Sequence, residues 1–182
     1  MNFEQLPEDI PVPEDDGACD HLTGIIIPKI ILNATNSEEI NIGNLHGYTV
    51  IYIYPMTGQP NIALPEGWDS IPGARGCTPQ SCSFRDIHSD LIQYASIYGL
   101  SSQVTDYQFE AKSRLHLPFE LLSDTNFLLK QKLSLPTFSH EGVERYKRVT
   151  LILKNNLIKK VFFPVFPPDE NPTDVLNWLE QQ

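Results

Sequence analysis

The sequence predicts an α/β protein, with a mixed central sheet flanked by helices and an N-terminal extension. Three observations support this: strand-like and helix-like segments alternate along the chain, one strand is apolar on both faces, and the first 20 residues are rich in acids and prolines. A chain of 182 residues is expected to form one domain and to bury roughly 70% of its unfolded surface without a disulfide or metal. The composition, with 41% hydrophobic and 20% charged residues, is that of a globular protein.

Residues 1–21 are predicted to be an acidic, extended and solvated arm, followed by a domain over residues 22–182. Residues 1–20 hold seven acids and no base, and acidic side chains prefer water. Three prolines, Pro7, Pro11 and Pro13, exclude a helix. Apolar residues by which the arm could dock on the body are Leu6, Ile10 and Val12.

The formal net charge of −10 argues against nucleic acid or an anionic membrane surface as a partner, because both require a basic face. Much of that charge belongs to the arm, whereas residues 143–163 hold six bases and the single acid Glu144. No apolar run approaches the ~20 residues of a membrane span, and the acidic beginning does not resemble a secretory signal. An odd, small number of cysteines is not a disulfide framework, so we expect reduced thiols in a cytoplasmic protein.

The first half of the domain is predicted to contain three strands and a long loop. Residues 25–32 and 38–42 are short strands, and Pro28 places the first of them at an edge. Residues 48–54 (YTVIYIY) are apolar on both faces, which is typical of a central strand covered by helices. Residues 55–79 contain five prolines and four glycines, and long irregular loops inside compact domains are usually functional.

The second half alternates helices and strands. The predicted segments are a helix from about Pro79 to Tyr94, a strand at Ser96–Leu100, a helix at Asp106–Leu115, an extended segment at Leu117–Leu122, a helix at Asn126–Leu133, strands at Val149–Leu153 and Leu157–Phe163, and a final helix from Pro172–Thr173. Asn155-Asn156 suits the positive φ angles of a tight hairpin between the last two strands. This order of elements is typical of a thioredoxin-like sheet.

Two cysteines five residues apart dominate the centre of the chain, in the run GCTPQSCSFRD at residues 76–86. Pro79 belongs in a first helical turn, which places Cys77 at or just before the helix N-terminus. Free N–H groups and the helix dipole favour an anion there, so the position suits a nucleophilic thiolate.

Cys82 lies on the same predicted helix as Cys77. An intact helix would separate the two Cα atoms by ~8.7 Å and ~140°. A disulfide requires less than ~7 Å, so pairing would require the first turns to unwind. Cys82 shares its helix face with the polar residues Arg85, Asp86 and Ser89, so we expect it to lie nearer to water than the core.

The residues alone leave other interpretations of this pair open. Both cysteines could be ordinary small, buried helix residues, because a free cysteine often behaves as a hydrophobic side chain. A zinc site is disfavoured, because C-x4-C is not accompanied by a second cysteine pair or a histidine doublet at ligand spacing.

The run GCTPQSCSFRD, after a strand ending in Tyr54-Pro55, resembles the peroxiredoxins, and most closely their Q type, also called bacterioferritin-comigratory-protein-like. Its members carry a G-C-T-x-x-x-C-x-F-R-D stretch. Further matches in family order are residues 98–101 (YGLS), 117–124 (LPFELLSD) and 148–153 (RVTLIL).

The resemblance implies a thiol-dependent peroxidase of hydrogen peroxide or organic hydroperoxides. Cys77 would be the peroxidatic cysteine, which becomes a sulfenic acid, and Cys82 the resolving cysteine, which forms an intramolecular disulfide with it. Arg148 would hold the thiolate and the peroxide oxygens. A thioredoxin-like or other thiol reductant would restore the thiols. The resemblance implies no cofactor and favours a monomer over a dimer.

The chain departs from the family pattern P-x-x-x-T-x-x-C, whose Thr hydroxyl binds the thiolate and the peroxide. Ala74 stands at the Thr position and Ser70 at the Pro position. Candidate replacements for the missing hydroxyl are Thr57, Ser70, Thr78 and the backbone N–H groups at Gly76–Cys77. Arg75 is expected to face solvent.

Two other functions remain possible on this fold. The missing Thr motivates a non-catalytic redox sensor or interaction module, and a metal-handling protein of the copper-chaperone kind is a weaker alternative. We expect Trp68 to anchor the long loop and Cys19, in the acidic arm, to be a bystander thiol.

Overall fold

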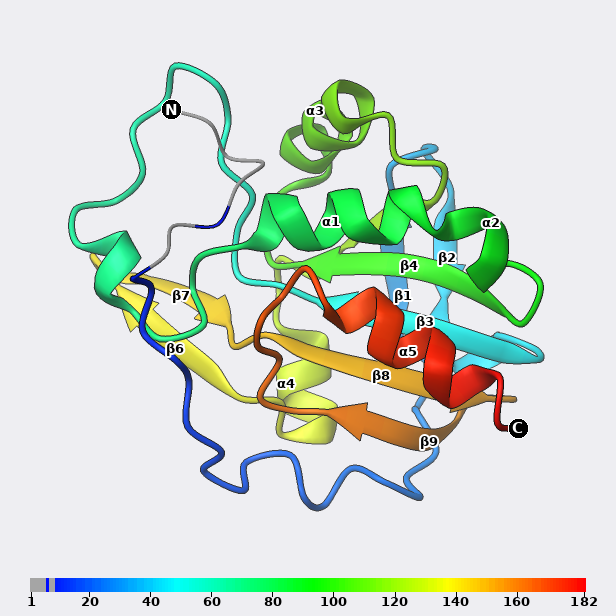
Figure 1. The fold of residues 1–182 in the computed structure, drawn as a ribbon. Coiled ribbons are helices and arrows are strands. Elements are labelled where there is room, and N and C mark those ends of the chain that lie inside the picture. The colour runs from blue at the N-terminus through cyan, green and yellow to red at the C-terminus, as the bar shows by residue number, and fades with distance from the viewer. Residues whose placement is uncertain (1–5, 7–8) are drawn as a thin grey trace.

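The computed structural model describes Leu6 and residues 9–182, and it is built on one seven-stranded mixed sheet in the order β2-β1-β5-β4-β3-β8-β9 (Figure 1). Its strands are β1 (Ile31–Ala34), β2 (Glu39–Asn41), β3 (Tyr48–Ile53), β4 (Ala95–Ser101), β5 (Glu120–Ser123), β8 (Val149–Lys154) and β9 (Leu157–Phe162). A separate hairpin consists of β6 (Thr137–His140) and β7 (Val143–Tyr146).

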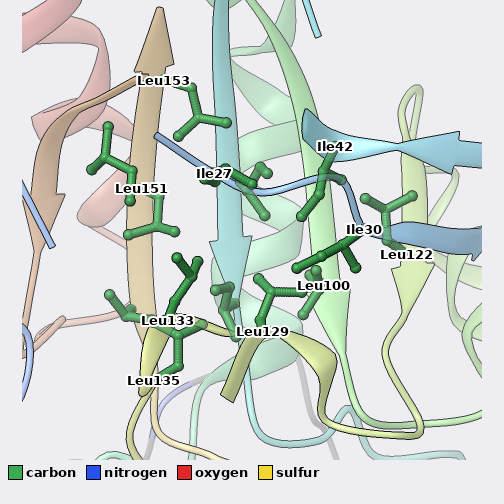
Figure 2. Packing of buried hydrophobic residues seen from close by; sticks show 14 of the residues in the cluster. Ile27, Ile30, Ile42, Leu100, Leu122, Leu129, Leu133, Leu135, Leu151 and Leu153 are labelled. Atoms are coloured by element: carbon green, nitrogen blue, oxygen red, sulfur yellow. The ribbon is translucent and has the colours of Figure 1, made fainter. Parts of the chain in front are cut away.

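Helices cover both faces of the large sheet, as the sequence predicts. They are α1 (Cys77–Asp86), α2 (His88–Leu91), α3 (Thr105–Leu115), α4 (Leu128–Leu133) and α5 (Asn171–Leu179), with short 3-10 turns η1 (Ile42–Asn44) and η2 (Trp68–Ser70). One apolar cluster contains side chains of α1, α3 and α5, and the other contains side chains of α4 and of the segment before β1. Figure 2 shows the second cluster.

Strand β3 is central, and this prediction is confirmed. It pairs in parallel with β4 and antiparallel with β8. Ile51 and Ile53 enter one apolar cluster, whereas Val50 and Tyr52 enter the other, so successive side chains fill both cores. The loop after this strand therefore begins at a rigid, fully buried position, which is a suitable support for a functional segment.

The first predicted strand is wrong in its bounds and its position. Strand β1 begins at Ile31, and before it only Ile26 forms an isolated bridge, to Leu157. Pro28 cannot donate to a ladder, so this stretch crosses the sheet and inserts Ile27 and Ile30 into the core instead (Figure 2). Strand β1 lies between β2 and β5, and is not an edge.

The C-terminal hairpin was correctly predicted, whereas the β6–β7 hairpin was not. Asn155 and Asn156 have φ angles of 48° and 61°, the left-handed values of a tight two-residue turn. The predicted helix from Pro79 to Tyr94 divides at Ile87 into α1 and α2. In the described part of the chain no helix is long and apolar enough to cross a membrane.

The N-terminal arm packs on the body over the residues that the structure describes. Lys147 Nζ forms an ion pair with Asp16 at 2.6 Å, and His21 Nε2 lies 2.8 Å from the Leu133 carbonyl oxygen. Residues 14–17 are exposed, as expected of a solvated arm, but Cys19 is only 5% exposed and belongs to the core. The expected arm residues 1–5, 7 and 8 lie outside the described part.

Candidate active site

Cys77 is the first residue of α1, as the sequence predicts, and its side chain is only 3% exposed. Gly76 caps the helix with a φ of 97°, a left-handed value that favours glycine. The side chains of Leu6 and Pro168 pack directly over Gly76, where a Cβ would collide with both. The close packing and the turn fix the direction of the loop into the helix, and thus the position of the Cys77 sulfur.

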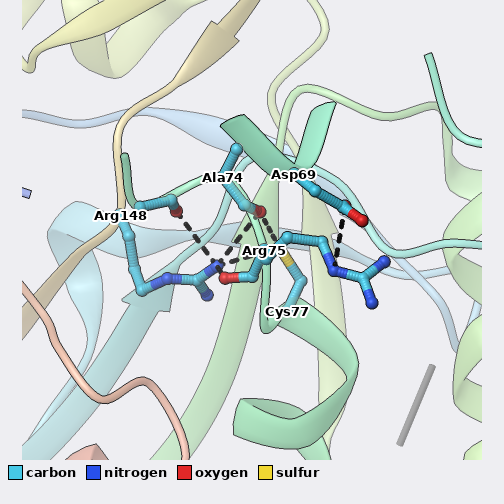
Figure 3. A network of polar contacts seen from close by, with 6 residues as sticks. Asp69, Ala74, Arg75, Cys77 and Arg148 are labelled. Atoms are coloured by element: carbon cyan, nitrogen blue, oxygen red, sulfur yellow. Dashed lines mark hydrogen bonds and ion pairs between the residues drawn. The ribbon is translucent and has the colours of Figure 1, made fainter. Parts of the chain in front are cut away.

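Arg148 contacts the Cys77 sulfur from the residue preceding β8 (Figure 3). Its Nη2 lies 3.2 Å from Sγ and also donates to the Arg75 carbonyl oxygen at 2.9 Å. The side chain is 4% exposed, and no carboxylate of the described residues forms an ion pair with it. A guanidinium stays charged in proteins, so the thiolate form of Cys77 would provide the anion that this buried cation lacks.

The helix N-terminus adds a second stabilising influence on the thiolate. As a thiol, Sγ donates weakly to the Ala74 carbonyl oxygen at 3.6 Å. A thiolate cannot donate and instead accepts from the guanidinium, while the first-turn N–H groups present their positive end to it. The surroundings of Sγ therefore favour a nucleophile.

Gln80 is a site residue that the sequence analysis missed. Its Oε1 accepts a hydrogen bond from Nη1 of Arg148, and the side chain is fully buried. The signal was available in the spacing, because a residue three positions after Cys77 lies on the same face of the helix.

Cys82 lies on the uninterrupted helix α1, and its expected position nearer to water is wrong. The side chain is 8% exposed and belongs to the same apolar cluster as Cys77. The first six residues of α1 are all buried, so this part of the helix has no solvent-facing side. All three cysteines are thiols in this structure.

A cavity of about 20 Å³ lies against Cys77, lined also by Ala74 and Thr78. A space of this size holds a molecule about as small as water. The Thr78 hydroxyl is buried and has no hydrogen-bond partner among the described residues. By contrast, the Thr57 hydroxyl donates to Gln103 at 3.3 Å, and Ser70 is exposed. Of the three candidate hydroxyls, that of Thr78 is therefore the buried one without a hydrogen-bond partner in the described part of the chain.

Trp68 anchors the long loop, as expected. Its side chain is 2% exposed, packs against Phe138 with the ring centres 5.9 Å apart, and lies under the guanidinium of Arg145. Arg75 does not face solvent as predicted: its side chain is 10% exposed and pairs with Asp69 at 3.2 Å. Trp68 and Arg75 both belong to the long loop, and their contacts help to hold the loop backbone around Cys77.

Cys19 lies in the apolar cluster on the opposite face of the sheet from Cys77. Burial, together with the acids Asp16 and Asp15, raises the pKa of the Cys19 thiol to about 12. A thiol that stays protonated at neutral pH is a poor nucleophile, which agrees with its expected role as a bystander.

No family model matches the chain. Peroxiredoxin Q of rice (Oryza sativa subsp. japonica), a chloroplastic protein, is 23% identical over 159 residues, which are 86% of this chain and 66% of the rice protein. The chain thus spans about two thirds of the length of this relative.

Two bacterial structures show the same fold. Peroxidoxin BcpB from Mycobacterium tuberculosis superimposes with a TM-score of 0.71 at 20% identity, covering 87% of this chain and 96% of that one. The bacterioferritin comigratory protein of Xanthomonas campestris, described for its alkyl peroxide reduction activity, gives 0.67 at 17% identity, covering 95% and 98%. The predicted thioredoxin-like fold is confirmed. Sequence relatives and fold agree with the motif around Cys77, and in both respects the chain is similar to the Q-type, bacterioferritin-comigratory-protein-like peroxiredoxins.

Proposed function

We propose that this chain is a thiol-dependent peroxidase in which Cys77 is the peroxidatic and Cys82 the resolving cysteine. The Cys77 thiolate attacks the terminal oxygen of a hydroperoxide, the O–O bond breaks, and the alkoxide leaves as an alcohol after taking a proton. The sulfenic acid then condenses with the Cys82 thiol, which forms a disulfide and releases water. An external dithiol supplies two electrons and two protons to regenerate both thiols.

The observation that carries this proposal is the buried contact between Arg148 Nη2 and Cys77 Sγ at 3.2 Å. A buried cation without a carboxylate partner among the described residues stabilises the attacking thiolate. It also stabilises the negative charge that develops on the peroxide oxygens as their bond breaks. The alkyl peroxide reduction activity of the Xanthomonas campestris relative supports organic hydroperoxides as substrates, alongside hydrogen peroxide.

The decisive experiment combines peptide mass mapping with steady-state turnover. One equivalent of peroxide is expected to produce a Cys77–Cys82 disulfide, and a thioredoxin system is expected to support continuous peroxide consumption. A protein that forms the disulfide once but does not turn over would be a redox sensor, which is the alternative that Ala74 in place of Thr suggests. A protein that leaves Cys77 unmodified would contradict both functions.

Thr78 is proposed to provide the hydroxyl that Ala74 lacks, because this residue lines the cavity at Cys77 and its buried hydroxyl has no hydrogen-bond partner among the described residues. Thr78→Val keeps the shape of the side chain and removes the hydroxyl. We expect kcat/KM for peroxide to fall about tenfold, since one hydrogen bond to the reacting oxygens is lost. Thr78→Ser keeps the hydroxyl and should retain activity. An unaltered kcat/KM in the valine variant would exclude this role.

The physiological setting follows from the same proposal. A dithiol protein of the thioredoxin kind is the proposed reductant, the cytoplasm the proposed location and a monomer the proposed state. Light scattering tests the monomeric state, and activity assays with purified thioredoxin test the reductant.

A further inference from the structure

Arg148 is held by a buried network in which every side chain is neutral. Gln80, Thr150 and Asn171 come from α1, β8 and α5, and their exposed fractions are 0%, 0% and 2%. Gln80 accepts from Arg148, and Asn171 connects Gln80 to Thr150. Three separate elements thus converge behind one guanidinium.

The hydrogen bonds of Asn171 determine which way the Gln80 amide faces. Its Oδ1 accepts from Gln80 Nε2 at 3.0 Å and from the Thr150 hydroxyl at 2.7 Å. Because the Gln80 nitrogen is directed to Asn171, the Gln80 oxygen is directed to Nη1 of Arg148. The opposite orientation of the amide would place an NH₂ group against the guanidinium, where two donors face each other.

The remaining acceptors of the guanidinium are also uncharged. Nη2 donates to the carbonyl oxygens of Gly73 at 3.3 Å, Ala74 at 3.5 Å and Arg75 at 2.9 Å, in addition to Cys77 Sγ. A carboxylate at the Gln80 position would neutralise the cation through a charge-assisted bond, but an amide does not. The positive charge of Arg148 therefore stays available to the sulfur.

The other ionisable groups near Cys77 do not compete for this charge. They are Tyr52 on β3, Tyr54 directly after this strand, Tyr107 on α3, and Arg75, whose cation pairs with Asp69. Burial raises the pKa of Tyr52, Tyr54 and Tyr107, so the three phenols remain neutral.

We propose that Gln80 is a positioning residue which aims Arg148 at Cys77 and, by being neutral, leaves the guanidinium charge to the thiolate. Asn171 and Thr150 act through Gln80 by fixing its amide orientation. The inference rests on the proposed nucleophilic role of Cys77. The new element is that the charge of the residue at position 80, one helical turn after Cys77, controls the reactivity of the Cys77 thiolate.

Gln80→Glu tests the charge without changing the size of the side chain. The readout is the rate of Cys77 alkylation by iodoacetamide against pH, followed on the Cys77 peptide by mass spectrometry. The midpoint of this profile is expected to rise by about one pH unit, the effect of placing a nearby like charge beside the thiolate. Gln93→Glu, an exposed matched control after α2, should leave the midpoint unchanged. An unchanged midpoint in folded Gln80→Glu, as judged by circular dichroism, would overturn the proposal.

Thr150→Val and Thr150→Ser form a second, independent pair that changes no charge. The valine variant releases Asn171 and so frees the Gln80 amide to rotate. Its alkylation midpoint should rise, and its kcat/KM for peroxide should fall severalfold. The serine variant keeps the hydroxyl and should retain the original profile. Equal midpoints in the two variants would show that the amide orientation does not matter.

These measurements separate the inference from the proposed function. Alkylation needs no peroxide, so a shifted midpoint in Gln80→Glu supports the positioning role even if the protein does not turn over. Peroxide turnover together with unchanged midpoints in Gln80→Glu and Thr150→Val would overturn the positioning role alone.

Discussion

Cys77→Ser is expected to abolish peroxide consumption, with a fall in kcat/KM of at least about 10⁴-fold, because a serine hydroxyl stays protonated at neutral pH and is a weak nucleophile. Arg148 and the N-terminus of α1 can stabilise a thiolate, but an alcohol is much less acidic than a thiol, so they cannot ionise the serine hydroxyl to the same extent. Peroxide consumption is measured in the presence of a thioredoxin system, and the absence of a sulfenic acid is confirmed by mass spectrometry after a single addition of peroxide.

Cys19→Ala is the matched control for this variant. Cys19 lies across the sheet from the site, and its raised pKa keeps it protonated, so the alanine variant should consume peroxide at the unmodified rate. Turnover that survives in Cys77→Ser and disappears in Cys19→Ala would show that the assignment of the nucleophile is wrong.

Arg148→Met should reduce kcat/KM for peroxide by about 10²- to 10³-fold, since the site loses the donor that stabilises charge on the sulfur and on the leaving oxygen. Arg148→Lys retains a charge but not the planar fork, which bonds at once to Gln80, to Arg75 and to the sulfur. We therefore expect the lysine variant to recover only part of the lost activity. Stopped-flow measurement of sulfenic acid formation separates this step from reduction of the disulfide.

Arg145→Lys provides a control on the neighbouring hairpin, because Arg145 packs on Trp68 and does not contact the sulfur. Its peroxide kinetics should stay within about twofold of the unmodified protein, as for a contact outside the reacting atoms. If Arg148→Met reacted with peroxide as fast as the unmodified protein, the guanidinium would have no part in O–O cleavage.

The features that could be predicted from sequence are those set by local chemistry. The apolar alternation of β3 and the paired asparagines of the last hairpin depend on neighbours in the chain, and both were predicted correctly. The start of α1 at Cys77 follows from glycine before it and proline within its first turn. The position of the proposed nucleophile at a helix N-terminus therefore follows from the sequence alone.

The features that were missed depend on contacts between distant segments. A helical wheel places Cys82 beside polar residues, but the first turns of α1 are covered on all sides, so the thiol is buried. Gln80 gains its importance only where β8 and α5 bring Arg148 and Asn171 to α1. Spacing along the helix shows that Gln80 faces the site, but not what it contacts there.

The packing of Leu6 and Pro168 over Gly76 has a consequence for timing in the proposed cycle. The peroxide step requires α1 to be wound at Cys77, whereas the disulfide requires its first turns to open, because the two cysteines are too far apart on an intact helix. In the proposed cycle, each contact that holds Gly76 in place would therefore lengthen the lifetime of the sulfenic acid. During that interval a second peroxide molecule would compete with Cys82, and further oxidation to the sulfinic acid would remove the protein from the cycle.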